Sequence, residues 1–260
     1  MSPAENKVAI ADSGPEKRAG RSAGGRAGRR IALRRKTRET EVLVELNLDL
    51  DLDGASTGGG RDECVRVDTG IGFLDHLLTG LAFHAGWGLE LRSAGDLEID
   101  DHHSVEDCAL LLGEALARAL VRGAAPRRFG YAYAPLDESL SRAVVDLSGR
   151  PFAVVELGLG ALRIGELSAE NVGHFLSSFA TAARMTLHVD VLRSGNAHHA
   201  AESAFKALAL ALRAACSIDS LQRAPQTGEG ASTKGGVLLE ELDREAFDEA
   251  ASRLRRGGPR

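Results

Sequence analysis

DDHHSVEDCALLLGEALARAL, from Asp100 to Leu120, is matched 96 residues later by NAHHAAESAFKALALALRAAC, from Asn196 to Cys216. In both stretches the apolar residues recur at helical spacing, which predicts one amphipathic helix in each. The shift places Val105, Cys108, Ala109, Leu112, Leu116, Ala119 and Leu120 on Ala201, Ala204, Phe205, Leu208, Leu212, Ala215 and Cys216, and His102, His103 and Glu106 on His198, His199 and Glu202. A shared polar triplet in the same phase indicates an internal duplication.

The elements before each of these helices also follow one order. The first half reads as strands in EVLVELNLDL and CVRVDT, a helix in GFLDHLLTGLAFHAG and a strand in GLELRSAGDLEI. The second half reads as strands in LSRAVVDL and PFAVVEL, a helix in AENVGHFLSSFATAAR and a strand in MTLHVDVL. The predicted fold class is therefore α/β, of the two-layer α+β type, with a duplicated strand–strand–helix–strand–helix unit.

Composition limits the class of protein. The 260 residues are 43% hydrophobic and 27% charged, as in ordinary globular proteins, and no apolar run approaches the ~18 residues of a membrane span. The three cysteines occur singly, so neither a disulfide framework nor a cysteine zinc site is expected, and a cytoplasmic location is the default. Residues 1–40 carry 11 Lys/Arg against 4 Asp/Glu, and we interpret the low-complexity start as a disordered, solvated tail rather than a nucleic-acid or membrane site.

The histidines suggest metal binding, because all eight lie between His76 and His199. On a helix, residues three and four apart project to neighbouring positions, whereas the adjacent histidines of each triplet diverge by ~100°. Each histidine of a pair could therefore hold its own ion with the glutamate between them. The two triplets predict two metal sites with ligands from both halves.

His76 and His174 extend the symmetry, because each lies near the start of the first helix of its half. Imidazole and carboxylate ligands without thiolate suit manganese, iron or zinc in a catalytic site. Asp100, Asp101 and Asp107 are available for bonds to the free imidazole nitrogens. A single HHxxE sequence more often marks a polar helix N-terminus than a metal site. His84 and His188 have no counterpart in the other half, so packing or a structural hydrogen bond is the favoured interpretation for both.

Six further stretches carry a family resemblance. They are RKTRET (35–40), TGIGFLDHLL (69–78), GDLEIDDHHSVED (95–107), RRFGYAYAPLDESL (127–140), DLSGRP (146–151) and STKGGVL (232–238). In this order they resemble the imidazoleglycerol-phosphate dehydratase family. The resemblance divides the chain into a basic extension (1–33), a dehydratase domain (34–239) with pseudo-repeats at about 34–125 and 126–239, and a tail (240–260) with the pattern of one amphipathic helix. It implies a four-stranded sheet with paired helices in each half.

The resemblance also implies the site. Two manganese ions per active site would be bound by His76, His102, His103, Glu106, His174, His198, His199 and Glu202. The substrate would be contacted by His103 and His199, and its phosphate by Arg128, Arg150, Lys206, Ser232 and Lys234. Arginine and lysine are natural phosphate donors, and a Ser-Thr-Lys-Gly-Gly turn adds backbone N–H groups. Glu39, from RKTRET, is implied to lie close to the reacting carbons.

The expected reaction is loss of water from imidazole glycerol phosphate, which gives imidazole acetol phosphate, with Glu39 as acid/base and contributions from Glu106 and Glu202. The expected partners are the small phosphorylated substrate and further copies of the chain, 24 subunits built from trimers, without nucleic acid or membrane. The alternative is a dinuclear metal hydrolase acting on a phosphorylated small molecule, which usually uses aspartate bridges that the triplets lack. A metal-storage or assembly protein would not explain the Arg/Lys set.

Overall fold

The computed structural model describes residues 28–50, 64–122, 125–160, 162–218 and 238–254. The first half contains β1 (Arg30–Lys36), β2 (Thr40–Asn47), β3 (Val65–Asp68), α1 (Gly72–Ala85), β4 (Gly88–Gly95) and α2 (His102–Val121). The second half contains β5 (Phe129–Leu136), β6 (Ser139–Asp146), β7 (Phe152–Glu156), β8 (Arg163–Ile164), β9 (Leu167–Ser168), α3 (Ala169–Ala182), β10 (Thr186–Arg193) and α4 (Ala197–Cys216). The chain ends with β11 (Leu238–Glu241) and α5 (Arg244–Leu254).

The duplication is visible in the topology of the two main sheets. The first sheet has the order β11-β1-β2-β4-β3 and the second has the order β5-β6-β10-β7. In both, the last pair in the order is parallel and joined through a helix, and the other neighbours are antiparallel. The mixed α/β fold class predicted from the sequence is confirmed, and β11 adds a fifth strand to the first sheet alone.

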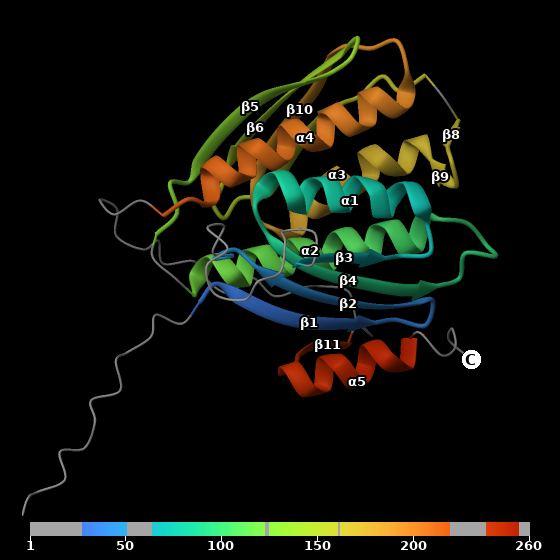
Figure 1. The fold of residues 1–260 in the computed structure, drawn as a ribbon, viewed down its shortest axis with the longest axis vertical. Helices are drawn as coiled ribbons and strands as arrows, with labels where there is room; N and C mark the ends of the chain where they lie inside the picture. The colour runs from blue at the N-terminus through green and yellow to red at the C-terminus, as the bar shows by residue number, and fades with distance from the viewer. Residues whose placement is uncertain (1–27, 51–63, 123–124, 161, 219–237, 255–260) are drawn as a thin grey trace, which may run out of the picture.

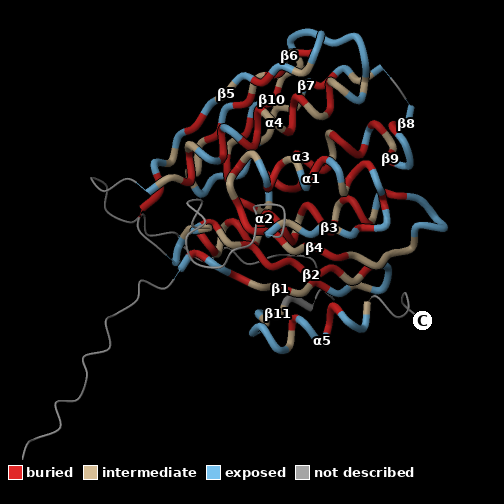
Figure 2. The backbone as a smooth tube through the Cα atoms, viewed as in Figure 1, coloured by how far each residue is buried: buried red, intermediate tan, exposed pale blue. Residues whose placement is uncertain are grey.

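The helices α1 to α4 lie between the two sheets (Figure 1). The helices of one half pack against those of the other: α1 lies along α4, and α2 lies along α3. Buried residues accordingly concentrate on the inner faces of both sheets and along the helices, while the outer strands alternate between buried and exposed positions (Figure 2). Within the described residues, no helix combines the length and apolar character that a membrane crossing requires.

Hydrophobic periodicity undercounted the strands, because three strands of a main sheet precede the first helix of each half rather than two. The strands missed there are β1 and β5, and the short strands β8, β9 and β11 were missed as well. The strand β1 carries four Arg and Lys residues among its seven, which made it look like the basic tail, and it begins at Arg30, upstream of the boundary predicted at residue 34. The inward positions of β5 are small because α4 lies against it: a Cβ on Gly130 would stand 2.0 Å from the carbonyl oxygen of Ala211.

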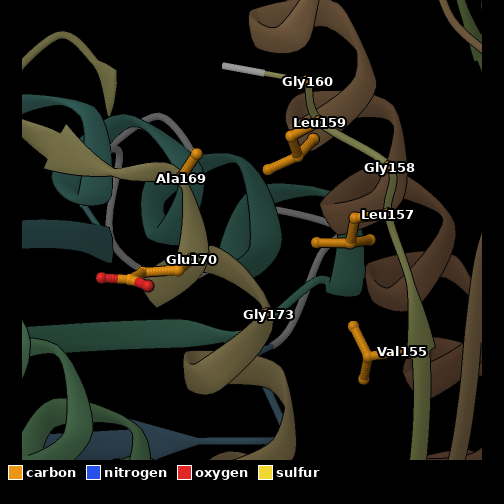
Figure 3. A pocket seen from close by; sticks show the side chains of 8 residues that line it. All are labelled: Val155, Leu157, Gly158, Leu159, Gly160, Ala169, Glu170 and Gly173. Atoms are coloured by element: carbon orange, nitrogen blue, oxygen red, sulfur yellow. The ribbon is translucent and has the colours of Figure 1, made fainter. Parts of the chain in front are cut away.

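The segment between β7 and β8 turns at two glycines with positive φ, Gly158 (55°) and Gly160 (64°), a conformation that strains other residues. A pocket of about 260 Å³ lies between this segment and the start of α3 (Figure 3). Its lining consists of Val155, Leu157, Gly158, Leu159, Gly160, Ala169, Glu170 and Gly173. The lining offers one charged side chain, Glu170, and lacks the converging polar groups that fix a ligand's orientation.

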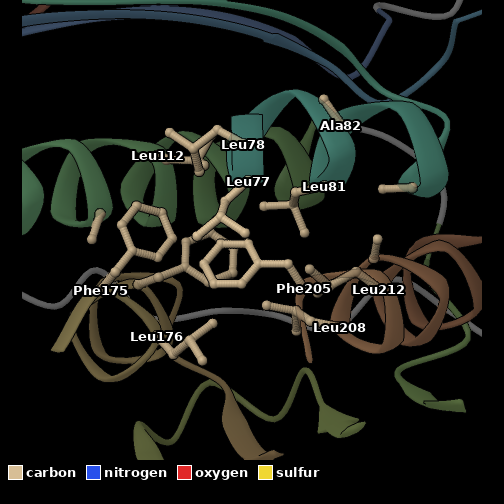
Figure 4. Close-up of a cluster of buried hydrophobic side chains, with 14 of the residues drawn as sticks. Leu77, Leu78, Leu81, Ala82, Leu112, Phe175, Leu176, Phe205, Leu208 and Leu212 are labelled. Carbon is tan, nitrogen blue, oxygen red and sulfur yellow. The ribbon is translucent and has the colours of Figure 1, made fainter. Parts of the chain in front are cut away.

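The core is centred where the four long helices meet (Figure 4). The side chains of Leu77, Leu81, Leu112, Phe175, Leu176, Phe205, Leu208 and Leu212 are all buried there. The contact between α2 and α3 is close enough to require glycine, because a Cβ on Gly113 would lie 2.5 Å from the carbonyl oxygen of Phe179. This packing fixes the helix starts, from which the candidate ligands project.

The outer faces of the two sheets differ. The helix α5 covers the first sheet, where Phe247 is buried against Leu43 and Arg244 pairs with Glu45 (Nη1 to Oε2, 2.7 Å). The outer face of the second sheet instead exposes aromatic side chains, among them Tyr131 and Phe152. The amphipathic pattern of the C-terminal tail therefore corresponds to a docked helix.

Candidate metal centres and active site

The first candidate centre lies where α1 meets the start of α4. His76, from α1, stands beside His198 and Glu202, from α4. Glu202 Oε2 is 3.1 Å from His76 Nε2 and 3.2 Å from His198 Nε2. One potential ligand atom from each of the three residues lies within 4.8 Å of the others, so the three side chains could share one ion.

The second candidate centre lies where α2 meets α3. His102 and Glu106, from α2, stand beside His174, from α3, again with ligand atoms within 4.8 Å of one another. The rings of His102 and His174 stack with centroids 4.6 Å apart. Asn171 Oδ1 lies 3.3 Å from His102 Nδ1, which leaves the other ring nitrogen of His102 for an ion.

The sequence places both histidine pairs in the first turn of a helix, where local caps hold them. Asn196 Oδ1 accepts from the backbone N–H of His198 (2.8 Å) and more weakly from that of His199 (3.4 Å). Asp100 Oδ1 accepts from the backbone N–H of His102 (2.9 Å). These bonds satisfy N–H groups that the helix leaves unpaired and fix the start of each helix, and so the direction of its histidines.

A divalent cation fits these residues on structural grounds. His174 Nε2 is buried and has no hydrogen-bond partner among the described residues, although the carboxylate of Glu106 lies 3.7 Å away. A buried polar nitrogen without a partner is costly, and an ion bound beside the carboxylate would satisfy the nitrogen. The two imidazoles and one carboxylate of each centre are suitable ligands for manganese, iron or zinc.

His103 and His199 point away from both centres. His103 Nδ1 lies 3.0 Å from Asp96 Oδ2, and His199 Nδ1 lies 3.0 Å from Glu138 Oε2. Each hydrogen bond to a carboxylate raises the pKa of its histidine, and the bond from His199 lowers the pKa of Glu138 to about 2. A carboxylate on Nδ1 fixes the tautomer and presents Nε2 outward as a potential ligand.

The three aspartates available for bonds to the imidazole nitrogens have other partners. Asp100 caps α2, and Asp101 accepts from the backbone N–H and the hydroxyl of Ser168. Asp107 is paired with Arg35. In the described structure these three carboxylates therefore bond groups other than the imidazole rings. The groups at hydrogen-bond distance from an Nδ1 atom of the paired histidines are Asn171, Asp96 and Glu138.

Known proteins share this arrangement of sequence and fold. The sequence model of the family described as Imidazoleglycerol-phosphate dehydratase matches residues 69–212. A protein of that name from Candida glabrata is 53% identical over 219 residues, covering 79% of this chain and 98% of the relative, and one from Saccharomyces cerevisiae is 48% identical over 210 residues, covering 75% and 94%. The chain belongs to the imidazoleglycerol-phosphate dehydratase family.

A solved structure supports the same assignment. The crystal structure of imidazoleglycerol-phosphate dehydratase from Staphylococcus aureus superposes with a TM-score of 0.60 at 33% identity, covering 68% of this chain and 94% of that one. The family resemblance seen in the motifs is thus confirmed. Proteins of this name are carbon–oxygen lyases of histidine biosynthesis, EC 4.2.1.19, and the chain is an enzyme of that class.

Two of the residues implied to bind phosphate, Arg128 and Arg150, lie away from both centres within one chain. Arg128 and Arg150 lie at the end of the second sheet where α4 finishes, since the backbone N–H of Arg128 donates to Ala215 O (3.1 Å) and Thr186 Oγ1 donates to Arg150 O (3.4 Å). Asp146 holds the guanidinium of Arg128 (Nε to Oδ1, 2.6 Å). Ser232 and Lys234 lie outside the described residues.

Lys206 is the one described phosphate candidate beside a centre. Its Nζ lies 2.8 Å from Glu202 Oε1, one helical turn away. Burial alone would raise the pKa of Glu202, but hydrogen bonds from Lys206 and His76 outweigh it and lower this pKa to about 2. Glu202 is therefore ionised throughout the physiological range, as a metal ligand must be.

Glu39 lies in the turn between β1 and β2, half-exposed, with Oε2 3.9 Å from His103 Nε2. It is thus beside one of the outward-pointing histidines. The corresponding turn of the second half, between β5 and β6, carries Asp137 and Glu138 beside His199. The turn carboxylates were not matched across the halves from the sequence, because the two turns differ in sequence and are related only through the sheets.

The two unmatched histidines take no part in the centres. His84 lies on α1, where burial, and secondly the charge of Lys206, lower its pKa. His188 lies on β10, exposed on the outer face of the second sheet opposite Val144. Neither is among the described residues that could share an ion.

Proposed function

We propose that the chain catalyses the metal-dependent dehydration of imidazole glycerol phosphate to imidazole acetol phosphate, in the cytoplasm, with two manganese ions per active site. The family assignment supports the substrate and reaction. The observation that carries the metal dependence is the pair of matched centres, above all the buried His174 Nε2 that lacks a partner among the described residues 3.7 Å from Glu106.

The proposed metal ligands divide into those that lie in the two centres and those that point away from them. His76, His198 and Glu202 would hold one ion, and His102, Glu106 and His174 would hold the other. His103 and His199 would present Nε2 to ions of neighbouring subunits, because each ring points away from its own centres. When bound, the ions would act as Lewis acids that withdraw electron density from the substrate's imidazole ring and hold it in place.

A distance within the chain supports the proposal of an active site between subunits. Glu202 and Ala215 are thirteen residues apart on α4, which corresponds to about 20 Å along the helix axis. Arg128, bonded to Ala215, is therefore much farther from the first centre than an imidazole ring with a three-carbon phosphate chain can span. The substrate's phosphate would instead be held by arginines of another copy. We propose a homo-oligomer, 24 subunits built from trimers, on the family resemblance.

The proton chemistry is assigned to Glu39. Removing hydrogen from a carbon beside an imidazole requires a base close to that carbon, and a carboxylate is well suited once the ring is polarised. Glu39 is half-exposed on its turn and faces His103, so a ring bound near His103 Nε2 would lie within its reach. The same group can then return the proton to the departing hydroxyl. Glu106 and Glu202 remain ligands that also shape the charge around the ring.

The phosphate chemistry is assigned to four basic residues and a serine. Arg128 is oriented by Asp146 and stacks on the ring of Phe129, with its guanidinium carbon 4.8 Å from the centroid. A guanidinium whose orientation is fixed in advance loses little side-chain entropy on binding phosphate. Arg150 is exposed and Lys206 is near the first centre, while Ser232 and Lys234 complete the set proposed from the family motif.

The test is a reaction assay with the purified full chain, manganese and imidazole glycerol phosphate. Imidazole acetol phosphate should form without release of inorganic phosphate, and chelation should abolish turnover until manganese is restored. Glu39→Gln should retain bound manganese and lose activity, whereas His188→Gln, on the outer face of the second sheet, should resemble wild type. Release of inorganic phosphate, or full activity after exhaustive chelation, would contradict the proposal.

A further inference from the structure

The turn that carries Glu39 is tied to the helix that carries the histidine triplet by a buried polar network. Arg35 Nη2 lies 2.8 Å from Asp107 Oδ1, and the hydroxyl of Thr40 donates to Asp107 Oδ2. Arg35 is on β1, Thr40 is the first residue of β2, and Asp107 follows Glu106 on α2. The three residues are 8%, 3% and 5% exposed. None of them touches a candidate centre.

The network continues to the backbone of Glu39 itself. Thr37 Oγ1 accepts from the backbone N–H groups of Glu39 (3.1 Å) and Thr40 (2.9 Å), and it lies 3.2 Å from Thr40 Oγ1. Because the Thr40 hydroxyl proton goes to Asp107, the Thr37 hydroxyl can donate to Thr40 Oγ1, and its other acceptor, Thr40 O at 3.4 Å, belongs to the same residue. Contacts of hydrogen-bond length therefore run from the amide of Glu39 through Thr37 and Thr40 to Asp107.

The second half has no charged equivalent at this place. The shift of 96 residues that relates α2 to α4 puts Ser203 at the position of Asp107. Ser203 is fully buried and shares a neutral hydrogen bond with Ser141 (Oγ to Oγ, 2.7 Å). A buried ion pair costs more desolvation than a neutral bond, so its presence in only one half is not explained by the shared fold.

We propose that Arg35, Thr40 and Asp107 are positioning residues that fix the turn bearing Glu39, and thus its carboxylate, relative to His103. The inference rests on the proposed role of Glu39 as the acid/base group. The carboxylate must be held within a fraction of an ångström of the reacting carbon, while the turn has no other buried side-chain anchor among the described residues. Asp107 supplies that anchor from the helix that also sets His103.

The decisive variant is Thr40→Val, which keeps the shape and the β-branch but removes the hydroxyl. In the manganese-loaded full chain it should lower kcat about 10- to 100-fold, because the catalytic group is misplaced, with KM changed less than about twofold and bound manganese unchanged. Amide exchange at residues 37–40 should become faster. Thr40→Ser, which keeps the hydroxyl, should restore kcat and exchange toward wild type.

The matched control is Arg29→Met compared with Arg35→Met. Arg29 is 5% exposed and pairs with Asp49 (Nη2 to Oδ1, 2.6 Å) at the opposite end of the β1–β2 hairpin. Both variants remove a buried arginine from the same hairpin, so both should lower the melting temperature. Only Arg35→Met should lower kcat as Thr40→Val does. An equal loss of kcat in Arg29→Met would show that the network only stabilises the fold and does not position Glu39.

A second mutation separates positioning from stability. In a Glu39→Gln background, Thr40→Val should cause no further loss of kcat, because the group that the network positions is already absent. Additive losses, a parallel loss of manganese, or unchanged exchange at residues 37–40 would each overturn the proposal. Failure of the wild-type chain to dehydrate the substrate would instead overturn the proposed function, and the exchange data would then decide the network alone.

Discussion

His174 Nε2 and Glu106 Oε1 face each other at 3.7 Å, from α3 and α2, which belong to different halves of the chain. In the other centre the equivalent atoms, His76 Nε2 and Glu202 Oε2, are 3.1 Å apart. The first distance exceeds a hydrogen bond and the second does not. The two halves thus build pseudo-equivalent centres: in one the nitrogen and the carboxylate are at hydrogen-bond distance, and in the other they are farther apart.

Metal stoichiometry should follow this division of ligands. His76→Ala removes a ligand from the first centre only, and His174→Ala removes one from the second only. Each variant should therefore reduce bound manganese from about two ions per chain to about one, because the centres use separate side chains. Elemental analysis after removal of free metal measures this. His188→Ala is the control and should retain both ions; loss of both ions from either ligand variant would mean that the centres are not separate.

The pH dependence of metal binding should reflect the pairing of His103 with Asp96. Their hydrogen bond raises the pKa of His103 in the folded chain. Protonated His103 therefore stabilises the metal-free chain, fully so below the pKa of about 6.5 that a histidine has in the unfolded chain. This stabilisation is lost as the pH rises through the raised pKa. A metal ion requires neutral imidazole, so protons should compete for His103 to a higher pH than at an ordinary histidine.

The variant Asp96→Asn tests the direction of this pKa shift. The variant should lower the pKa of His103 in the metal-free chain and shift the acid limit of manganese binding to lower pH. NMR titration of the His103 ring and manganese affinity measured between about pH 5 and 8 give the two quantities. A His103 pKa that stays the same in Asp96→Asn would rule out the hydrogen bond as its cause.

The docking of α5 should depend on Phe247. This side chain is fully buried in a small cluster with Leu43, Ala250 and Ala251. Phe247→Ala should weaken docking of the helix by about 3 kcal/mol, and because the cluster is separate from the main core, the helix should detach locally. Faster amide exchange and proteolysis confined to residues 238–254, with kcat unchanged, would show it. Arg253→Ala, on the exposed side, is the control; an equal fall in the melting temperature of the whole domain would contradict a local effect.

The sequence predicted the features that depend on short-range periodicity. The paired helices and the shift of 96 residues follow from a repeat of apolar and polar side chains, and the equivalent positions Leu112 and Leu208 are both fully buried. The strand β5 escaped detection because Gly130 and its small inward neighbours were selected for the approach of α4, not for strand periodicity. The need for small residues on β5 becomes apparent only once α4 is packed against the strand.

The grouping of ligands could not be predicted either. His102 and His103 are adjacent in sequence, but their side chains contact different residues because the helix turns by ~100° per residue. Which histidine of the other half joins each pair depends on the packing of α1 with α4 and of α2 with α3. Asp96 reaches His103 from the end of β4, a contact set by the tertiary fold alone.

The last prediction concerns the division of one active site between copies of the chain. In a single chain, Arg128 and Glu202 lie near opposite ends of α4, about 20 Å apart along its axis. Arg128→Ala and Glu202→Gln should each be nearly inactive alone. If the two variants are dissociated by chelation, mixed equally and reassembled with manganese, roughly a quarter of the interfaces should combine an intact Arg128 from one copy with an intact Glu202 from another. Activity should then recover to about that fraction of wild type, although no chain in the mixture carries both residues. Each variant reassembled alone is the control. If the mixture remains as inactive as its components, both residues must act within the same chain, and the proposal of an active site shared between copies is wrong.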